Sequence, residues 1–162
     1  MLSVRKARQS DSKRFFTWRN DPLVVASSFT KGVIKMQDHQ RWYNQKLASD
    51  DCGLYVIEYE SEPAGQVRFD IAGPEATINY SLDAAFRGRG LATHSLHRAI
   101  AIFFEQHEYV TALVAFVKPD NAASCRVFEK LNFELDSFDT KMQANRYRMH
   151  LAEQQSDRLT GD

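Results

Sequence analysis

The sequence predicts an α/β (α+β layered) domain, in which a central mixed, mostly antiparallel sheet is flanked by helices on both faces. Three β-rich runs lie between residues 54 and 82 and are separated by short turns, which is typical of an antiparallel meander. After them come an amphipathic helical run and a nearly all-apolar strand over residues 111–117, as expected of a strand that is covered on both faces. A length of 162 residues with 43% hydrophobic side chains fits one such domain.

The N-terminal third is expected to form a strand followed by two helices. Residues 2–7 alternate weakly between apolar and polar side chains, which predicts the strand, and Asp11 can cap a helix that reaches about Arg19. Asp21-Pro22 then ends this helix, because the residue before a proline avoids the helical region. Asp38 can cap the second helix, whose inward side would carry His39, Trp42, Tyr43 and Leu47.

The rest of the chain alternates between strands and helices. Strands are expected over residues 54–59, 64–71 and 75–82, with turns at 60–63 and at Gly73-Pro74. The remaining expected elements are a helix over 92–106, a strand over 111–117, a helix opening at Asn121, and strands over 133–138 and 146–151. We expect residues 1–151 to form a single domain and residues 152–162 to form a polar C-terminal tail.

Composition excludes several classes of protein. The 21 basic and 21 acidic side chains cancel, so the chain lacks the positive charge with which proteins coat nucleic acid or an anionic membrane. Two cysteines, Cys52 and Cys125, cannot form a disulfide framework, and they fit a cytoplasmic protein with reduced thiols. The N-terminus has no apolar core behind its basic residues, so it does not resemble a signal peptide. His94 and His97 are three apart, but no third ligand is evident, so no metal is expected.

The loop before the long predicted helix has features of a phosphate site. Gly88 and Gly90 allow a tight turn and a close approach of the backbone to a ligand. The first amides of the following helix have no partners within the helix, and together with the helix dipole, Arg87 and Arg89 they suit a pyrophosphate. The loop matches neither the dinucleotide fingerprint nor a Walker A loop. A merely flexible start to the helix would look the same.

Two motifs together resemble those of the GNAT superfamily of acetyl-CoA-dependent N-acetyltransferases. The first is Arg87-x-x-Gly90-x-Ala92, which matches the superfamily's pyrophosphate loop. The second is Asn121-x-x-Ser124-x-x-x-Phe128-Glu129-Lys130-x-x-Phe133. Each motif alone is weak, but they occur in the right order on predicted strand–loop–helix units, and the order of elements fits across roughly residues 2–150.

The resemblance implies a GNAT acyltransferase fold and acetyl-CoA as co-substrate, without a metal. The co-substrate would bind where the strands ending near Leu82 and Val117 splay apart, and an amine would attack its thioester directly. The pantetheine arm would pair with the backbone at Leu82–Ala84, and loop amides would hold the pyrophosphate. The residues implied in acetyl-CoA binding are Leu82, Asp83, Ala84, Arg87, Gly88, Arg89, Gly90, Leu91, Ala92, Thr93, Asn121, Ser124 and Phe128.

The sequence departs from the superfamily pattern at two positions. Many members carry a tyrosine four residues after the motif serine, where its hydroxyl serves the departing thiolate, but this chain has Phe128 there. A phenyl ring has no proton to give, so water has to suffice unless another group serves; Tyr147, which otherwise fits the core, is one alternative. Asn132 replaces a glycine, and asparagine tolerates the left-handed conformation that often follows a helix.

Two neighbouring strands predict a polar face for the acceptor. Gln66, Arg68 and Asp70 share one side of their strand, while Glu75, Thr77, Asn79 and Ser81 share one side of the next. If the strands are antiparallel neighbours, these faces merge; a solvent-exposed face would show the same alternation. We predict Glu75, Asn79 and Ser81 as the catalytic group. We predict as acceptor-binding residues Trp18, Arg19, Asn20, His39, Trp42, Gln66, Arg68, Asp70 and Thr77. The base could be Glu75, Asp70, His39 or a chain of water.

A narrower resemblance points to a class of acceptor. Trp18-Arg19-Asn20 followed by Gly65-Gln66-Val67-Arg68-Phe69-Asp70 is similar to GNAT enzymes of the pseudaminic acid type, which acetylate an amino sugar linked to a nucleotide. The resemblance therefore implies a small-molecule amine as partner. We expect the protein to be a monomer or homodimer. Two alternatives stay open. One is an N-terminal acetyltransferase of the ribosomal-protein type, and the other is a regulatory module that binds acetyl-CoA without catalysis.

Overall fold

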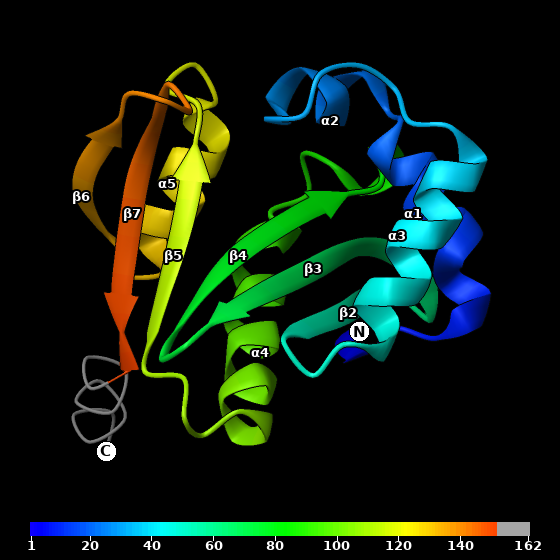
Figure 1. Cartoon of the computed structure of the whole chain (residues 1–162), viewed down its shortest axis with the longest axis horizontal. Helices are drawn as coiled ribbons and strands as arrows, with labels where there is room; N and C mark the ends of the chain where they lie inside the picture. The colour runs from blue at the N-terminus through cyan, green and yellow to red at the C-terminus, as the bar shows by residue number, and fades with distance from the viewer. Residues whose placement is uncertain (152–162) are drawn as a thin grey trace.

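One seven-stranded sheet organises residues 1–151, the part of the chain that the computed structural model describes (Figure 1). The strand order is β1-β2-β3-β4-β5-β7-β6, and every neighbouring pair is antiparallel except β4 and β5. The strands are β1 (Leu2–Lys6), β2 (Cys52–Tyr59), β3 (Glu62–Ala72), β4 (Glu75–Leu82), β5 (Ala112–Val117), β6 (Glu134–Asp139) and β7 (Ala144–His150). The helices are α1 (Ser12–Arg19), α2 (Pro22–Ser27), α3 (Met36–Ala48), α4 (Leu91–Gln106) and α5 (Ala122–Lys130), with short 3₁₀ turns η1 (Gln9–Asp11) and η2 (Ala84–Phe86).

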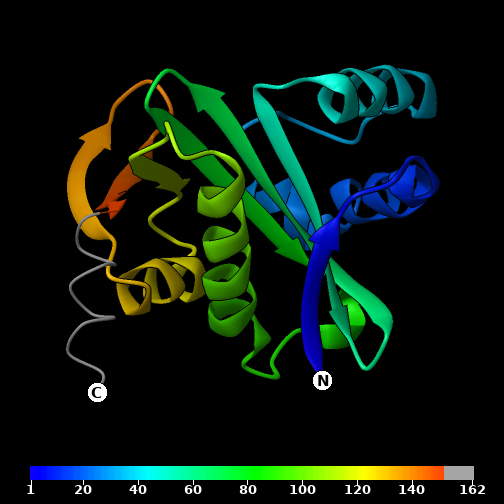
Figure 2. The same ribbon diagram turned by 90° about the horizontal axis from the view of Figure 1, so that it is seen from below.

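Helices cover both faces of the sheet, as the fold class predicted (Figure 2). Side chains alternate along β2, so that Leu54 and Val56 pack with α1 and α3 on one face. Tyr55 and Ile57 belong to the larger core on the opposite face, where α4 and α5 lie. All four are buried, which explains why this strand is rich in apolar residues rather than alternating with polar ones.

The register of β3 and β4 confirms that their polar faces merge. Gln66 lies opposite Ser81, Arg68 opposite Asn79, and Asp70 opposite Thr77. These side chains lie on the α1 and α3 side of the sheet, because their apolar neighbours on the same strands pack against α4. The face is not simply exposed, since Gln66 and Ser81 are 8% and 9% exposed.

The two strands at the centre of the sheet separate soon after they pair. Parallel pairing of β4 with β5 covers only residues 75–77 opposite 112–114. Beyond that point β4 continues to pair with β3 as far as Leu82, and β5 continues with β7 as far as Val117. Figure 1 shows the two strands diverging toward α2. The predicted splay is therefore confirmed, and it leaves one edge of β4 unpaired over its second half.

Several local expectations need correction. Pro22 does end α1, but it also begins α2, a helix that the sequence analysis did not predict. The Asp21 side chain caps α2 by accepting from the Leu23 amide at 3.0 Å. Helix α3 begins at Met36, so Asp38 lies in its first turn instead of capping it. Asn132 has a φ of 65°, which confirms the predicted left-handed residue.

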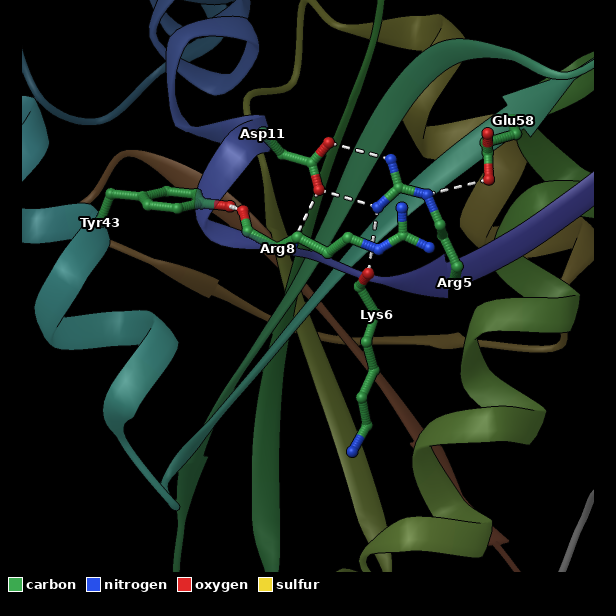
Figure 3. Close-up of polar contacts among 6 residues, drawn as sticks. All are labelled: Arg5, Lys6, Arg8, Asp11, Tyr43 and Glu58. Carbon is green, nitrogen blue, oxygen red and sulfur yellow. Dashed lines mark hydrogen bonds and ion pairs between the residues drawn. The ribbon is translucent and has the colours of Figure 1, made fainter.

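A partly buried charge cluster joins the start of the chain to the sheet (Figure 3). The Arg5 guanidinium donates to both carboxylate oxygens of Asp11, at 2.8 and 2.9 Å, and to Glu58 at 2.9 Å. The Asp11 carboxylate also accepts from the Arg8 amide at 2.7 Å. The Tyr43 hydroxyl donates to the Arg8 carbonyl, which ties α3 to the same cluster. Asp11 thus precedes α1 as predicted, but its side chain bonds to β1 and η1 and not to the helix amides.

The predicted polar tail, residues 152–162, lies outside the described residues. Within residues 1–151, no helix combines the length and apolar character needed to cross a bilayer.

Asp11→Asn should lower the free energy of unfolding by about 2 kcal/mol at pH 7, because the charge-assisted bonds to Arg5 are weakened. Bonding to Arg5 holds the pKa of Asp11 below its ordinary value of 3.8. The stabilisation is therefore present above that value and is lost as pH falls through the lower, folded pKa. Urea denaturation from pH 7 to pH 2 measures the difference between the two proteins. The exposed Asp50→Asn control should stay within about 0.5 kcal/mol of wild type. An Asp11→Asn protein with unchanged stability at pH 7 would contradict the structural role of the cluster.

Candidate active site

The loop before α4 adopts the conformation that its glycines predict. Gly88 and Gly90 have φ values of 74° and 71°, in the left-handed region that L side chains rarely adopt. Gly90 is the N-cap of α4, so the loop leads directly to the free amides of a helix of 16 residues. A Cβ atom at either glycine would meet no heavy atom within 4 Å, which leaves the loop open for a ligand.

A cavity of about 500 Å³ lies between this loop, the unpaired edge of β4 and the start of α5. The sequence-predicted co-substrate residues that line it are Leu82, Arg87, Gly88, Gly90, Leu91, Ala92, Asn121 and Ser124. The Asn121 side chain accepts from the Ser124 amide at 3.3 Å and so caps α5. The cavity therefore joins both sequence motifs, which are far apart in the chain.

Other residues predicted to bind the co-substrate do not line this cavity. They are Asp83, Ala84, Arg89, Thr93 and Phe128. The Asp83 carboxylate accepts from the Trp18 indole at 2.8 Å, and the Arg89 guanidinium lies over the Phe86 ring at 5.3 Å. Phe128 is 3% exposed and belongs to the core. Its ring therefore supports the fold from behind the cavity wall.

Helix α2 contributes a wall that sequence reasoning missed. Leu23, Val24, Ala26 and Ser27 line the 500 Å³ cavity. An ion pair of 2.9 Å joins Asp21, the cap of α2, to Arg87 of the loop. Lys118, just after β5, donates to the Ala26 carbonyl at 2.9 Å. These contacts hold α2 across the open end of the splay. The signal in the sequence was Asp21-Pro22, which is a helix start as well as a stop.

A second cavity of about 420 Å³ lies on the merged polar face, beneath α1, α2 and α3. It brings together sequence-predicted residues from four elements, namely Trp18, Arg19, His39, Trp42, Gln66, Arg68, Asn79 and Ser81. Gln66 donates to Ser81 at 3.2 Å and to Asn79 at 3.3 Å, so these polar groups form one connected row. Among the lining residues that the sequence analysis did not predict, Phe15, Ile34 and Tyr80 add apolar surface.

Two arginines and one aspartate line the 420 Å³ cavity. The Arg68 guanidinium lies over the Trp42 ring at 5.2 Å, and its Nε donates to Asp70 at 2.9 Å. The Arg19 guanidinium donates to the Thr30 carbonyl at 3.2 Å. Burial, and then the like charge of Arg68, lower the pKa of Arg19, so the two guanidinium groups repel one another. Asp38 is the one carboxylate residue among the described residues that line this cavity.

Three residues predicted to bind the acceptor lie outside the cavity. Asn20 holds the segment before α3, because its side chain donates to the Ile34 carbonyl at 3.0 Å and accepts from the Ile34 amide at 2.8 Å. The Asp70 carboxylate is bound to Lys46 at 2.8 Å as well as to Arg68. Thr77 lies where β4 still pairs with β5, away from the splay.

The predicted bases differ in their surroundings. Glu75 is the first residue of β4 and lies outside both cavities, with Arg146 at 3.4 Å and Arg148 at 3.6 Å from its carboxylate. Burial works to raise the pKa of Asp70, but Arg68 and Lys46 together lower it below its ordinary value. A carboxylate held in its ionised form by two cations is a weak proton acceptor at neutral pH.

His39 is neutral and largely enclosed. Its side chain is 1% exposed, and Nε2 lies 2.8 Å from the Ser12 carbonyl, which can only accept, so the proton sits on Nε2. Burial lowers the pKa of His39. The other nitrogen, Nδ1, is buried without a hydrogen-bond partner among the described residues. The ring thus shapes the wall of the 420 Å³ cavity between Phe16 and Trp42.

The two cavities meet at the end of β4. Both are lined by Val24, Ser27, Tyr80 and Ser81. Direct transfer between two bound molecules requires the reacting atoms to come within about 3–3.5 Å, so it can occur only where the two sites touch. Within residues 1–151, no group of three or more metal-ligating His, Cys, Asp or Glu side chains gathers there or elsewhere.

Comparison with known proteins agrees with this geometry. The sequence model of the acetyltransferase (GNAT) domain matches residues 2–134. A search of curated protein sequences finds no match.

Solved structures share the whole fold at low sequence identity. A crystal structure of the aminoglycoside acetyltransferase AAC(6')-Ib with coenzyme A and kanamycin is 20% identical with a TM-score of 0.84, over 98% of this chain and 99% of that one. Spermidine N-acetyltransferase from Vibrio cholerae, with CoA and spermine, is 15% identical with a TM-score of 0.82, over 93% and 96%. The ribosomal L7/L12 α-N-protein acetyltransferase RimL with CoA is 20% identical with a TM-score of 0.78, over 93% and 94%.

Gly90→Glu should weaken acetyl-CoA binding by at least about tenfold, or about 1.4 kcal/mol. The variant strains a left-handed position and puts a negative charge beside the amides that open α4. Gly73→Glu is the matched control, because Gly73 also has a positive φ, of 63°, and open space around it, but lies in the β3–β4 turn. Calorimetry should show a loss of affinity for Gly90→Glu alone. Equal affinity of both folded variants would remove the loop from the binding site.

Proposed function

Since this chain belongs to the GNAT family of acetyltransferases, we propose that it transfers the acetyl group of acetyl-CoA to the primary amine of a small molecule that also carries negative charge. A nucleotide-linked amino sugar is the acceptor that best combines these properties. The observation that carries the choice of acceptor is the pair Arg19 and Arg68 in the 420 Å³ cavity.

The 500 Å³ cavity has the features that acetyl-CoA binding requires. The open loop and the first amides of α4 present donors and a positive helix end to a pyrophosphate. The unpaired edge of β4 offers backbone groups to the amides of the pantetheine arm. AAC(6')-Ib, spermidine N-acetyltransferase and RimL, which share the fold, were solved with coenzyme A bound.

The charge of the acceptor cavity argues against a polycationic acceptor. Kanamycin and spermine, bound in two of the structural neighbours, carry several amines and are polycations at neutral pH. Two guanidinium groups lining one small cavity would repel such molecules. A phosphate would relieve the repulsion between Arg19 and Arg68, since guanidinium groups pair well with phosphate. The Asp38 carboxylate lines the same cavity and can accept a hydrogen bond from the amine end of the acceptor.

The same geometry supports direct attack on the thioester. The amine nitrogen would form its bond to the carbonyl carbon at the junction of the two cavities, where Ser81 lies, with Asn79 near it along β4. We assign these two polar groups to orienting the amine and polarising the carbonyl. Glu75 has no place in this scheme, because it lies outside both cavities. The amine proton would leave through water along the polar row of β3 and β4.

Turnover of acetyl-CoA with a panel of amines tests the proposal as a whole. Amino sugars linked to nucleotides should be acetylated, with free amino sugars, spermine and an N-terminal peptide as the comparison substrates. Preference for the peptide would instead establish the N-terminal acetyltransferase alternative. Binding of acetyl-CoA without turnover of any amine would favour the non-catalytic module.

Arg68→Met should raise the acceptor KM roughly 10- to 150-fold, the cost of losing a hydrogen bond to a charged group of about 1.5–3 kcal/mol. Acetyl-CoA affinity should be unchanged, because Arg68 does not line the 500 Å³ cavity. Lys46→Met is the matched control, since it also breaks an ion pair with Asp70 but lies outside the acceptor cavity. Steady-state kinetics with each substrate varied in turn gives both constants. If the two variants lose stability and KM alike, the role of Arg68 is the ion pair and not the acceptor.

A further inference from the structure

Three hydroxyl groups lie at the junction of the two cavities, and they differ in what they already bind. Ser27 donates to the carbonyls of its own helix, Leu23 at 3.0 Å and Val24 at 3.3 Å. Ser81 accepts from Gln66 and faces the acceptor side of β4. Tyr80 lies on the other face of β4, toward α5, where the co-substrate cavity continues. Of the three hydroxyl groups, only that of Tyr80 both lies on the co-substrate side of β4 and has no hydrogen bond to a backbone group among those described.

The surroundings of Tyr80 connect it to the second sequence motif. Its hydroxyl lies 2.9 Å from the Ser124 hydroxyl, and both residues line the 500 Å³ cavity. Its ring packs edge-on against Phe128, with the centroids 5.8 Å apart. Phe128 occupies the position where the motif often carries a tyrosine, and it has no hydroxyl to offer. A phenol from β4 therefore lies beside the ring that takes the place of the usual one.

We propose that the Tyr80 hydroxyl is the proton donor to the sulfur of coenzyme A, held in place by Ser124. This inference rests on the proposed acetyl transfer. It explains how the chain can keep an acid at the reaction centre with phenylalanine at position 128.

The amine nitrogen forms a bond to the thioester carbonyl carbon, and the carbon–sulfur bond then breaks with its electron pair going to sulfur. The Tyr80 proton moves to the sulfur and yields the free thiol of coenzyme A. The proton lost from nitrogen goes to water, and a proton from water returns to the Tyr80 oxygen through the Ser124 hydroxyl. No oxidant or further reactant is needed.

The local environment keeps Tyr80 in the form that can donate. Burial raises the pKa of Tyr80, an effect that the bond to Ser124 reduces without cancelling. The phenol is therefore protonated at neutral pH. A neutral donor aimed at a sulfur that becomes negative stabilises the charge where it develops.

Tyr147 is the matched control for Tyr80. It too is buried and packs against Phe128, and its hydroxyl donates to Glu129 at 3.3 Å. It lines neither cavity. Tyr80→Phe and Tyr147→Phe thus each remove one buried phenol hydroxyl around the same ring, but only Tyr80→Phe removes it from the cavity wall.

Two measurements test the proposal, and the first needs no acceptor. Calorimetry compares the affinity of each protein for coenzyme A and for desulfo-coenzyme A, which lacks the sulfur. Wild type and Tyr147→Phe should prefer coenzyme A by about fivefold, the size of one hydrogen bond. Tyr80→Phe should bind both equally. Kinetics with the best amine should show kcat of Tyr80→Phe about 100-fold lower, at the low end for a positioned acid because a thiolate leaves readily.

Every result of these two measurements either supports or overturns the role of Tyr80 as proton donor. Loss of the preference for coenzyme A together with the fall in kcat, in Tyr80→Phe alone, supports the proposal. An unchanged preference, an unchanged kcat, or an equal fall in the Tyr147→Phe control each overturns it. Thermal melting of both variants confirms that they are folded. If wild type acetylates no amine, the proposed function fails, while the comparison of the two coenzymes still reports whether Tyr80 contacts the sulfur.

Discussion

The early separation of β4 from β5 is the constraint on which the rest of the molecule depends. Two parallel strands that stayed paired would satisfy each other's backbone groups and close the centre of the sheet. Here pairing stops after residue 77, and the second half of β4 keeps its hydrogen bonds to β3 alone. The sheet can tolerate this because β5 stays paired with β7 along its whole length, residues 112–117. The result is a cleft with free backbone groups on one wall, opening toward both sequence motifs.

The two faces of β4 present side chains to the two sides of this cleft. Ile78 and Ala76 anchor one face in the core with α4, while Asn79 and Ser81 present polar groups to the opposite side. Tyr80 and Ser81 are neighbours in sequence that point to opposite faces, so one strand carries both a group toward the co-substrate side and a group toward the acceptor side. A direct transfer reaction needs two sites that touch, and a single strand at the splay provides this.

The charges around the 420 Å³ cavity are held by the framework. Arg68 is fixed from two directions, by Asp70 on its own strand and by the Trp42 ring from α3. Arg19 is tied to the backbone of the segment after α2. The framework therefore keeps both guanidinium groups on the wall of one cavity, and we propose an anionic group of the acceptor as their ligand. In the same way the Arg5 and Asp11 cluster secures α1, which carries Trp18 and Arg19 into the site.

Much of this protein was determined by local sequence pattern. Period-two alternation predicted the meander and the merged polar faces, because side chains on a strand point to alternate sides whatever surrounds them. Gly88 and Gly90 marked the loop, since the left-handed conformation strongly favours glycine. The two motifs located Arg87, Gly88, Gly90, Leu91, Ala92, Asn121 and Ser124 on the wall of the 500 Å³ cavity, because each motif is a short run of nearby residues.

Contacts between segments that are distant in the chain were decided only by the tertiary structure. Asp21-Pro22 reads as a helix end, and only the ion pair to Arg87 and the bond from Lys118 hold α2 across the cleft. Glu75 shares a strand face with Ser81, but its carboxylate is paired with the arginines of β7 and lies outside both cavities. Tyr80 reads as a core residue, and its place beside Ser124 appears only when α5 packs on the sheet. Alternation determines on which face a side chain lies, but partners are set by packing between elements, which local pattern does not encode.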